Sequence, residues 1–312
     1  MAVVRRDILS PQGAASRDAY VRGVKLLKQE IRQAGQPSTY DLFVLWHHRT
    51  MMIMTPPGNP LQRNAAHAGP VFLPWHRYKM IVLEQQLQRV LGDPNFGLPY
   101  WNWGKDGEKP RNQQNSSAIW AANCMGGGGN PVNTGPFAFN SADPQSWRVR
   151  YEGTSTGGTR STNRGLRRSF SYQPGLPRNA DLKTVVNMHP YDLMEWDTAA
   201  NSFRNCIEGW APTPPAFHNC VHVWIGGDMG ASTSPNDPVF YLNHANVDRA
   251  WAAWQQKHGA NAAYVPDAAA PAMLKGHRLN DRLTSIFPNP PKVSDMLDVS
   301  SVYAYDSVGD LM

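Results

Sequence analysis

Apolar residues recur at helical spacing in two stretches near the N-terminus, and each stretch is followed by residues that end helices. Residues 16–33 read SRDAYVRGVKLLKQEIRQ and are followed by Gly35. Residues 40–54 read YDLFVLWHHRTMMIM and are followed by TPPGNP at 55–60. Because apolar side chains three and four residues apart share one face of a helix, and because proline cannot continue a helix, the pattern predicts a helix over each stretch.

The same pattern predicts a third long helix and several shorter ones further along the chain. Residues 74–91 begin with Pro74, which suits a first turn, and end before Gly92, which suits the position just past a helix. Further helices are predicted at 181–188, 202–208, 218–224 and 245–259, with His244 just before the last one. The Gly-, Pro- and Asn-rich residues 104–180 are predicted to be irregular, with a few short strands.

Composition supports a folded chain with a large core. Of the 312 residues, 41% are hydrophobic, and 11 Trp, 11 Tyr and 10 Phe offer large surfaces for burial. No internal repeat or linker interrupts the pattern. We therefore expect a mainly α fold in which residues 1–312 form a single domain, a helical bundle joined by long irregular loops with few short strands.

The formal net charge is +6, and much of the basic excess lies in GGTRSTNRGLRRSF at 157–170. This run has no helical or strand period and no accompanying nucleic-acid motif. We therefore interpret it as a solvated surface loop and expect no nucleic-acid partner. A positive rim of this kind would attract acidic substrates toward a nearby cleft.

No segment of the sequence has the pattern of a signal peptide or a membrane span. The first ten residues, MAVVRRDILS, lack the apolar core of a signal peptide, and no stretch approaches the ~20 apolar residues that cross a bilayer. The expectation is a soluble chain that by itself stays in the cytoplasm. The three cysteines, Cys124, Cys206 and Cys220, match no zinc spacing and imply no disulfide framework.

The histidines carry the most specific chemistry in the sequence. FHNCVHVW at 217–224 places His218 and His222 four residues apart, so on a helix both imidazoles lie on one face and can reach one metal ion. The pair lacks the glutamate of H-E-x-x-H, which argues against a metalloprotease of that kind. The Glu-x-x-His pairs of di-iron bundles are missing as well.

Six of the ten histidines fall in two sets with apolar surroundings. They are His47, His67 and His76 in the N-terminal half and His218, His222 and His244 in the C-terminal half. A buried imidazole has to pair its ring nitrogens or bind a metal, and an all-imidazole site suits copper, zinc or nickel. Two three-histidine sites facing each other across a bundle indicate a coupled pair of copper ions, with a zinc hydrolase as an alternative.

Several motifs resemble those of the bacterial tyrosinases over nearly the whole chain. NAAH (64–67), FLPWHR (72–77) and LPYWNW (98–103) resemble the first copper half of that family. FRNCIEGW (203–210), FHNCVHVWIGG (217–227) and SPNDPVFYLNHANVDRAW (234–251) resemble the second half, and YAYD (303–306) resembles the element that closes the catalytic core. The resemblance implies a type 3 copper protein that binds dioxygen between two copper ions. Because little sequence follows YAYD, we expect no C-terminal shielding domain.

Carried onto this sequence, the resemblance implies that each of the six histidines is a copper ligand. His47, His67 and His76 would bind the first copper, and His218, His222 and His244 would bind the second. The motif YDLFVLWH places the first ligand at His47, with the adjacent His48 as the alternative. The resemblance also implies that Glu208, in IEGW, and Asn219, after His218, hold a water that takes the proton from a phenol. The loop between Glu208 and His218 is longer than is usual in the bacterial enzymes.

Other positions depart from the family pattern or need a structural partner. Val223 stands where some bacterial relatives have an arginine, which is expected to weaken a preference for carboxylated substrates. Residues 231–233 are small, which is expected to admit larger aromatic substrates. Asp248 follows His244 by four residues, so it is expected either to accept the ring N–H of His244 or to lie at the surface paired with Arg249.

The resemblance implies a copper-dependent phenol oxidase that uses dioxygen to hydroxylate monophenols and to oxidise o-diphenols to o-quinones. An o-aminophenol oxidase or a catechol oxidase on the same centre is the alternative, and an oxygen carrier like the hemocyanins is an alternative of another class. The expected partners are dioxygen, a small phenolic or aminophenolic molecule, and a small companion protein that delivers copper. If that companion also carries an export signal, the chain would be exported with it.

Overall fold

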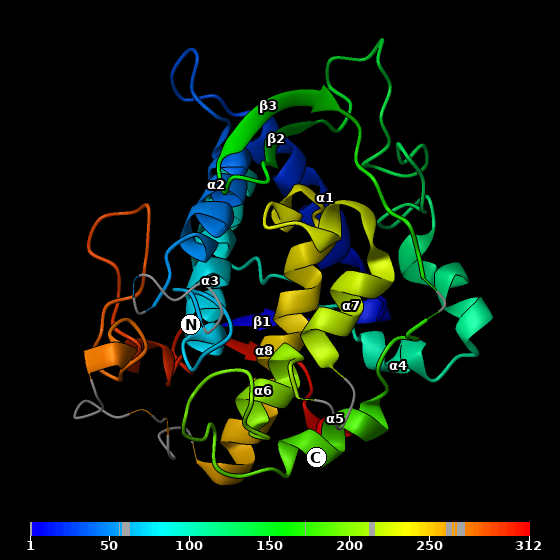
Figure 1. Ribbon diagram of the computed structural model, residues 1–312. Coiled ribbons are helices and arrows are strands. Elements are labelled where there is room, and N and C mark those ends of the chain that lie inside the picture. The colour runs from blue at the N-terminus through cyan, green and yellow to red at the C-terminus, as the bar shows by residue number, and fades with distance from the viewer. Residues whose placement is uncertain are drawn as a thin grey trace.

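The site is built on four helices that come from the two halves of the chain. The computed structural model describes residues 2–55, 57, 63–171, 173–211, 216–259, 264, 266 and 272–312. The four helices are α2 (Thr39–Met51), α3 (Phe72–Leu91), α7 (Phe217–Ile225) and α8 (Val239–His258). In Figure 1 the pair α2 and α3 faces the pair α7 and α8, and contacts of α3 with α8 join the two pairs.

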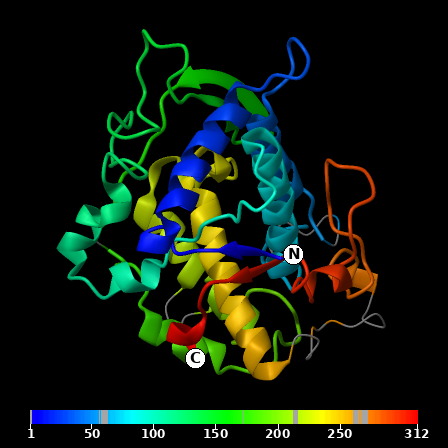
Figure 2. The same cartoon turned by 180° about the vertical axis from the view of Figure 1, so that it is seen from behind.

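Further helices cover this bundle. α1 (Ala14–Gln29) packs on α2 and α3 and is seen in Figure 2, where it crosses the rear of the molecule. The shorter helices are α4 (Trp103–Gly107), α5 (Asn179–Val186) and α6 (Phe203–Glu208). α6 packs against α7, so the segment that contains Glu208 lies beside the helix that carries two of the histidines.

Two small two-stranded sheets accompany the helices. β1 (Val3–Arg5) pairs in parallel with β4 (Tyr303–Tyr305), with Val3 opposite Tyr303, and so brings the two ends of the chain together, as Figure 2 shows. β2 (Val149–Gly153) and β3 (Thr159–Arg164) form an antiparallel hairpin that contacts α2.

A pair of tryptophans fixes the rotation of α2 against α3. Trp46 and Trp75 meet edge to face with ring centroids 5.6 Å apart, a geometry that is worth about 0.5–1.5 kcal/mol beyond its buried area. Both indole N–H groups donate to the carbonyl oxygen of Thr284, at 3.2 and 2.9 Å. Because each tryptophan directly precedes a histidine, the pair also sets the direction in which His47 and His76 point.

The predicted helices are present, with shifted ends. α1 ends at Gln29 rather than at residue 33, because Glu30 is extended and its carbonyl oxygen accepts from the Thr39 N–H at 2.8 Å. α2 ends at Met51 rather than at 54. Most of the TPPGNP stretch that was expected to end it lies outside the described residues.

α8 begins at Val239, so the prediction that His244 lies just before the helix is wrong. His244 lies within α8, in its second turn. The residues at the start of the helix are buried all round, so they lack the one-sided apolar pattern on which the prediction relied.

The interpretation of 157–170 as a loop is wrong for its first part, because β3 occupies Thr159–Arg164; a few short strands were expected within 104–180. β3 forms there from polar residues on both faces, which leaves no apolar alternation to detect. The arginines of the run 157–170 are largely paired with carboxylates. Arg164 donates to Asp228 at 2.8 Å, and the buried Arg168 donates to Asp237 at 2.7 Å. The basic run is therefore less able to attract acidic substrates than its sequence suggests.

Two smaller observations bear on earlier expectations. In the part of the chain that the structure describes, the helices are all too short or too polar to cross a membrane. The three cysteines are buried as thiols.

Candidate metal centre and substrate pocket

Six histidines from five segments meet between the two helix pairs. His47 lies on α2, His67 on the loop before α3, His76 on α3, His218 and His222 on α7, and His244 on α8. They form two groups of three, and in each group the candidate ligand nitrogens all lie within 4.8 Å of one another. The groups adjoin, because the rings of His76 and His244 stack with centroids 4.1 Å apart and planes 9° apart. The structure therefore brings together all six histidines singled out in the sequence.

Backbone carbonyl groups orient four of these rings. Each ring directs Nδ1 at a carbonyl oxygen: His47 to Ser232 at 2.7 Å, His76 to Phe72 at 2.8 Å, His222 to Met229 at 2.6 Å and His218 to Glu208 at 3.2 Å. A carbonyl oxygen only accepts, so in each ring Nδ1 carries the proton and Nε2 keeps its lone pair. Histidines that bind metals usually have this arrangement.

The Nε2 atoms have the environment of metal ligands. Within the described part of the chain, the Nε2 atoms of His47, His76 and His222 are buried and make no hydrogen bond. Leaving a buried polar atom unpaired costs about 1–3 kcal/mol each, so these Nε2 atoms, two in the first group and one in the second, are costly unless a cation is bound in each group. The Nε2 atoms of His218 and His244 lie 3.1 Å from each other.

Burial also keeps these rings neutral, which metal binding requires. It lowers the pKa of every one of the six imidazoles, to about 3 for His67 and about 4 for His222. The donor set of uncharged imidazoles fits copper or zinc.

His48, the alternative to His47, is directed away from this centre. Its Nδ1 lies 2.8 Å from the hydroxyl oxygen of Ser232, and its Nε2 lies 3.0 Å from the carbonyl oxygen of Gly157. Both ring nitrogens are therefore occupied, and the structure places His47 in the first group.

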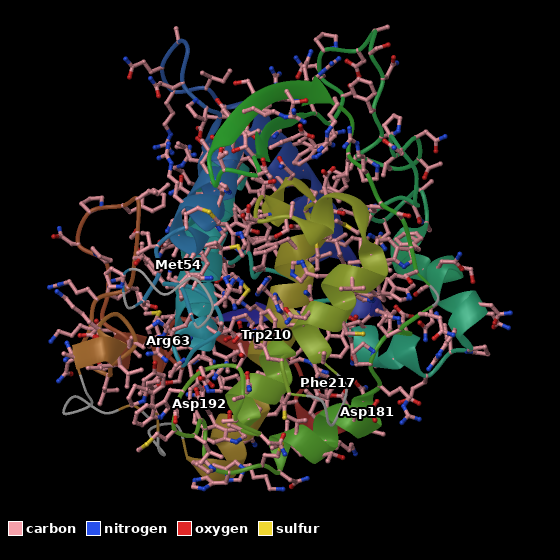
Figure 3. All side chains as sticks on the ribbon, in the orientation of Figure 1. Met54, Arg63, Asp181, Asp192, Trp210 and Phe217 are labelled. Carbon is pink, nitrogen blue, oxygen red and sulfur yellow. The ribbon has the colours of Figure 1, made fainter. Side chains whose placement is uncertain are left out.

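A cavity of about 660 Å³ opens onto the histidines and is lined by residues from both halves of the chain. Its floor includes His47, His67, His218 and His222. Its walls are mostly apolar and include Met51, Met54, Trp210, Val223, Met229 and Ala231; Met54 and Trp210 are labelled in Figure 3. Trp210 and Val223 stand at the mouth, with 48% and 56% of their surfaces exposed.

Arg63 adds a cation to this wall that the sequence analysis missed. It lines the cavity, and its Nη1 donates to the carbonyl oxygens of Glu195 and Trp196 at 3.3 and 3.2 Å. Figure 3 labels Arg63 close to Met54 at the same side of the molecule. The pocket wall therefore includes a cationic residue at position 63, although position 223 is a valine.

Glu208 and Asn219 occupy different positions relative to the cavity. Asn219 lines it, beside His218. Glu208 is fully buried behind it: one carboxylate oxygen accepts from the Ala68 N–H at 2.6 Å, and the other accepts from Arg204 at 3.0 Å. Burial raises the pKa of Glu208, and the positive charge of Arg204 opposes that rise. Part of the loop between Glu208 and His218, residues 212–215, lies outside the described residues.

Both expectations for Asp248 are wrong. It is buried rather than at the surface, and it accepts hydrogen bonds from the ring hydroxyls of Tyr303 and Tyr305 and from the guanidinium groups of Arg77 and Arg5. Arg77 donates to it at 2.6 Å. Although burial favours the protonated acid, the two arginines lower the pKa of Asp248. The carboxylate therefore anchors α8 to the N- and C-terminal strands.

Comparisons with known proteins show what this arrangement resembles. The family profile described as the common central domain of tyrosinase matches residues 37–257. A tyrosinase of Streptomyces glaucescens is 35% identical over 285 residues, which cover 89% of this chain and 91% of that protein. Grixazone synthase of Streptomyces griseus subsp. griseus is 35% identical over 303 residues, covering 89% and 92%. A variant of the polyphenol oxidase from Thermothelomyces thermophila has the same fold, with a TM-score of 0.69 at 23% identity over 97% of this chain and 88% of that one.

Proposed function

This chain belongs to the tyrosinase family, and we propose that its two histidine groups hold two copper ions while Glu208 and Asn219 assist the deprotonation of a phenol. The protein is a copper-dependent oxidoreductase that acts on phenols with dioxygen. An oxygen carrier is not favoured, because the similar proteins at 35% identity are enzymes. The copper pair, when bound, supplies the activation of dioxygen, and the chain supplies the ligands, the pocket and the proton acceptor.

The observation that carries the ligand assignment is the convergence of buried, neutral Nε2 atoms. Zinc would accept the same donors, but the family has a dicopper centre. Metal analysis of the protein reconstituted with copper should give about two Cu per chain. Replacing His76 or His222 with alanine should lower that number and abolish oxygen consumption with catechol. Full copper content in His76→Ala would contradict the assignment.

A phenol bound in this pocket needs a proton acceptor for its hydroxyl group, and we place that acceptor beside the second histidine group. A phenol titrates near pH ~10, so at neutral pH a base has to remove its proton before oxidation. Asn219 lines the pocket next to His218, and the backbone of Glu208 accepts from the ring of that histidine. A carboxylate has about four lone-pair sites, and Glu208 uses three of them, for the Ala68 N–H, Arg204 and the Trp210 side chain, which leaves capacity for one water shared with Asn219.

The substrate is proposed to be a monophenol or an o-diphenol, with a carboxylated o-aminophenol as the second candidate. The second candidate is supported by Arg63, a cationic residue among those that line the cavity, and by the volume of the cavity, about 660 Å³. A panel of tyrosine, tyramine, catechol, 2-aminophenol and 3-amino-4-hydroxybenzoate distinguishes the two. Faster turnover of the aminophenols than of catechol and tyramine would favour the second candidate.

Copper delivery by a small companion protein is also proposed, with export of the two proteins together. Support comes from the family resemblance and from the burial of five of the six ligand histidines, which copper reaches through a mostly apolar pocket. Coexpression with the companion should raise the copper content of the purified chain. Full loading of the apo-protein from chelator-buffered copper, at the same rate with and without the companion, would contradict this proposal.

A further inference from the structure

His48 joins three segments of the chain at the edge of the first histidine group. It lies on α2, directly after His47, and only 3% of it is exposed. Its Nδ1 meets the hydroxyl of Ser232 at 2.8 Å, and its Nε2 meets the carbonyl oxygen of Gly157, in the turn of the β2–β3 hairpin, at 3.0 Å. The Gly157 carbonyl only accepts, so Nε2 carries the proton and Nδ1 accepts from Ser232 in the neutral ring.

Ser232 is held by both consecutive histidines. Its carbonyl oxygen accepts from Nδ1 of His47 at 2.7 Å, while its hydroxyl bonds to His48. Ser232 also lines the substrate cavity. The position of this one residue therefore sets both the rotation of the His47 ring and the shape of the rim above it.

The hairpin supports this arrangement from outside. Gly153, the last residue of β2, packs closely on this pair, because a Cβ atom there would lie 3.1 Å from the Ser232 hydroxyl, a tight contact, and 3.6 Å from the His48 ring, in van der Waals contact. Four residues after Ser232, Asn236 donates to the carbonyl oxygen of Tyr151, in β2, at 2.8 Å. β2 thus packs directly over the pair, and His48 binds the hairpin turn in return.

We propose that His48 is a positioning residue which, through Ser232, holds the His47 ring in the orientation that binds the first copper. This inference rests on the proposed copper centre. Partners of metal-bound histidines typically contribute 10–100-fold to metal affinity. Since His48 acts through one intermediate residue, we expect an effect near the lower end, about tenfold, and confined to one of the two ions.

The test is the release of copper from the fully loaded protein into a competing chelator, followed over time. In His48→Leu, one copper per chain should leave about tenfold faster than in the wild type, while the second leaves at the wild-type rate. Ser232→Ala, which keeps the carbonyl but loses the hydroxyl, should show the same selective release. His258→Leu is the matched control, since His258 also bonds a carbonyl oxygen, that of Val186 at 3.0 Å, but lies far along α8 from the histidine groups.

A third variant keeps the proposal testable if His48→Leu does not fold. Gly153→Val leaves both His48 and Ser232 in place and pushes on the Ser232 hydroxyl from outside, so it should also release one copper selectively. Equal acceleration of both ions, or unchanged release in all three variants, would overturn the proposal.

A second measurement does not involve copper. Hydrogen exchange of the apo-protein should show faster exchange in the hairpin turn around Gly157 for His48→Leu but not for Ser232→Ala, because only the first loses the bond to that turn. Unchanged exchange in His48→Leu would overturn the part assigned to the hairpin. A wild-type protein that fails to take up two copper ions would instead refute the proposed function, so the two failures are distinguishable.

Discussion

Replacing Glu208 with glutamine separates a role in proton transfer from a role in stability. The carboxylate lies between two donors, the Ala68 N–H at 2.6 Å and Arg204 Nη1 at 3.0 Å. A glutamine has the same shape but one of its two ends is an NH₂ group, so whichever way it turns, one donor faces another donor. The change also removes a negative charge beside a buried guanidinium.

The expected loss of stability follows from the surroundings of Arg204. Removing one partner of a buried ion pair costs about 3–5 kcal/mol. Arg204 keeps Asp192, to which it donates at 2.9 and 3.2 Å, so we expect the lower end, about 3 kcal/mol. For a chain of this size each kcal/mol lowers Tm by about 2 °C, so Tm should fall by about 6 °C.

The kinetic effect should be specific to monophenols. Loss of a general base typically costs ~10²–10⁴-fold, so the monophenol rate should fall at least tenfold relative to the catechol rate, at unchanged copper content. A catechol is more acidic and depends less on that base. The assay measures oxygen consumption with tyramine and with catechol, well below the Tm of the variant.

Asp192→Asn provides the matched control for this experiment. It removes the other carboxylate from Arg204 and should cost similar stability, but it touches neither Ala68 nor His218. Its tyramine-to-catechol ratio should equal that of the wild type. If Glu208→Gln lowers both rates equally, or lowers neither, the proton-transfer role is refuted, and Glu208 then serves to connect the two halves of the site.

Three further predictions concern the ligands, the buried charges and pH. His47→Ala should reduce bound copper to about one per chain while His48→Ala, saturated with copper, should still bind two; metal analysis giving the reverse would move the ligand by one residue. Asp248→Asn should destabilise the fold by about 3–5 kcal/mol in urea unfolding, because it leaves Arg77 and Arg5 without their shared carboxylate, yet leave the copper content of the folded protein unchanged. The apo-protein should lose stability as pH falls from about 6.5 toward 4, because His67 and His222 have folded pKa values of about 3 and 4 and the unfolded chain therefore binds more protons in that window. Each of these histidines should lower the free energy of unfolding by about 1.4 kcal/mol per pH unit in that window. A Tm of the apo-protein that stays constant between pH 7.5 and 5 would show that the two histidines do not have lowered pKa values.

Helices with a one-sided apolar pattern and clear end signals could be predicted from the sequence, and those without could not. α3 runs to Leu91 as expected, because Gly92 adopts the left-handed conformation, with φ 65°. The start of α8 could not be found in this way, because Val239 to Asn243 are buried on every side. The position of β3 within 104–180 could not be predicted for the opposite reason, since its residues are polar on both faces and the strand depends on pairing with β2.

The candidate ligands could be found because histidines in short motifs are visible in a sequence, whereas the groups that orient them are not. The rings of His47 and His222 donate to the carbonyl oxygens of Ser232 and Met229. Every residue has a carbonyl group, so no residue type marks these acceptors. Arg63 was missed because the pocket wall is assembled from segments more than a hundred residues apart.

Asp248 shows why spacing alone does not identify the partner of a ligand. Four residues separate it from His244, so the two side chains start on one face of α8, but arginine and tyrosine donors occupy the carboxylate instead. Hydrogen bonds between ionised partners are roughly twice as strong as neutral ones, so two guanidinium groups outcompete an imidazole N–H. As a result, the Nδ1 of His244 makes no hydrogen bond within the described residues. Its ring is oriented by packing, stacked on His76 at 4.1 Å and tilted against Phe240 at 4.2 Å. The two copper sites therefore depend on each other for ligand geometry, because a ring of the first group orients a ring of the second.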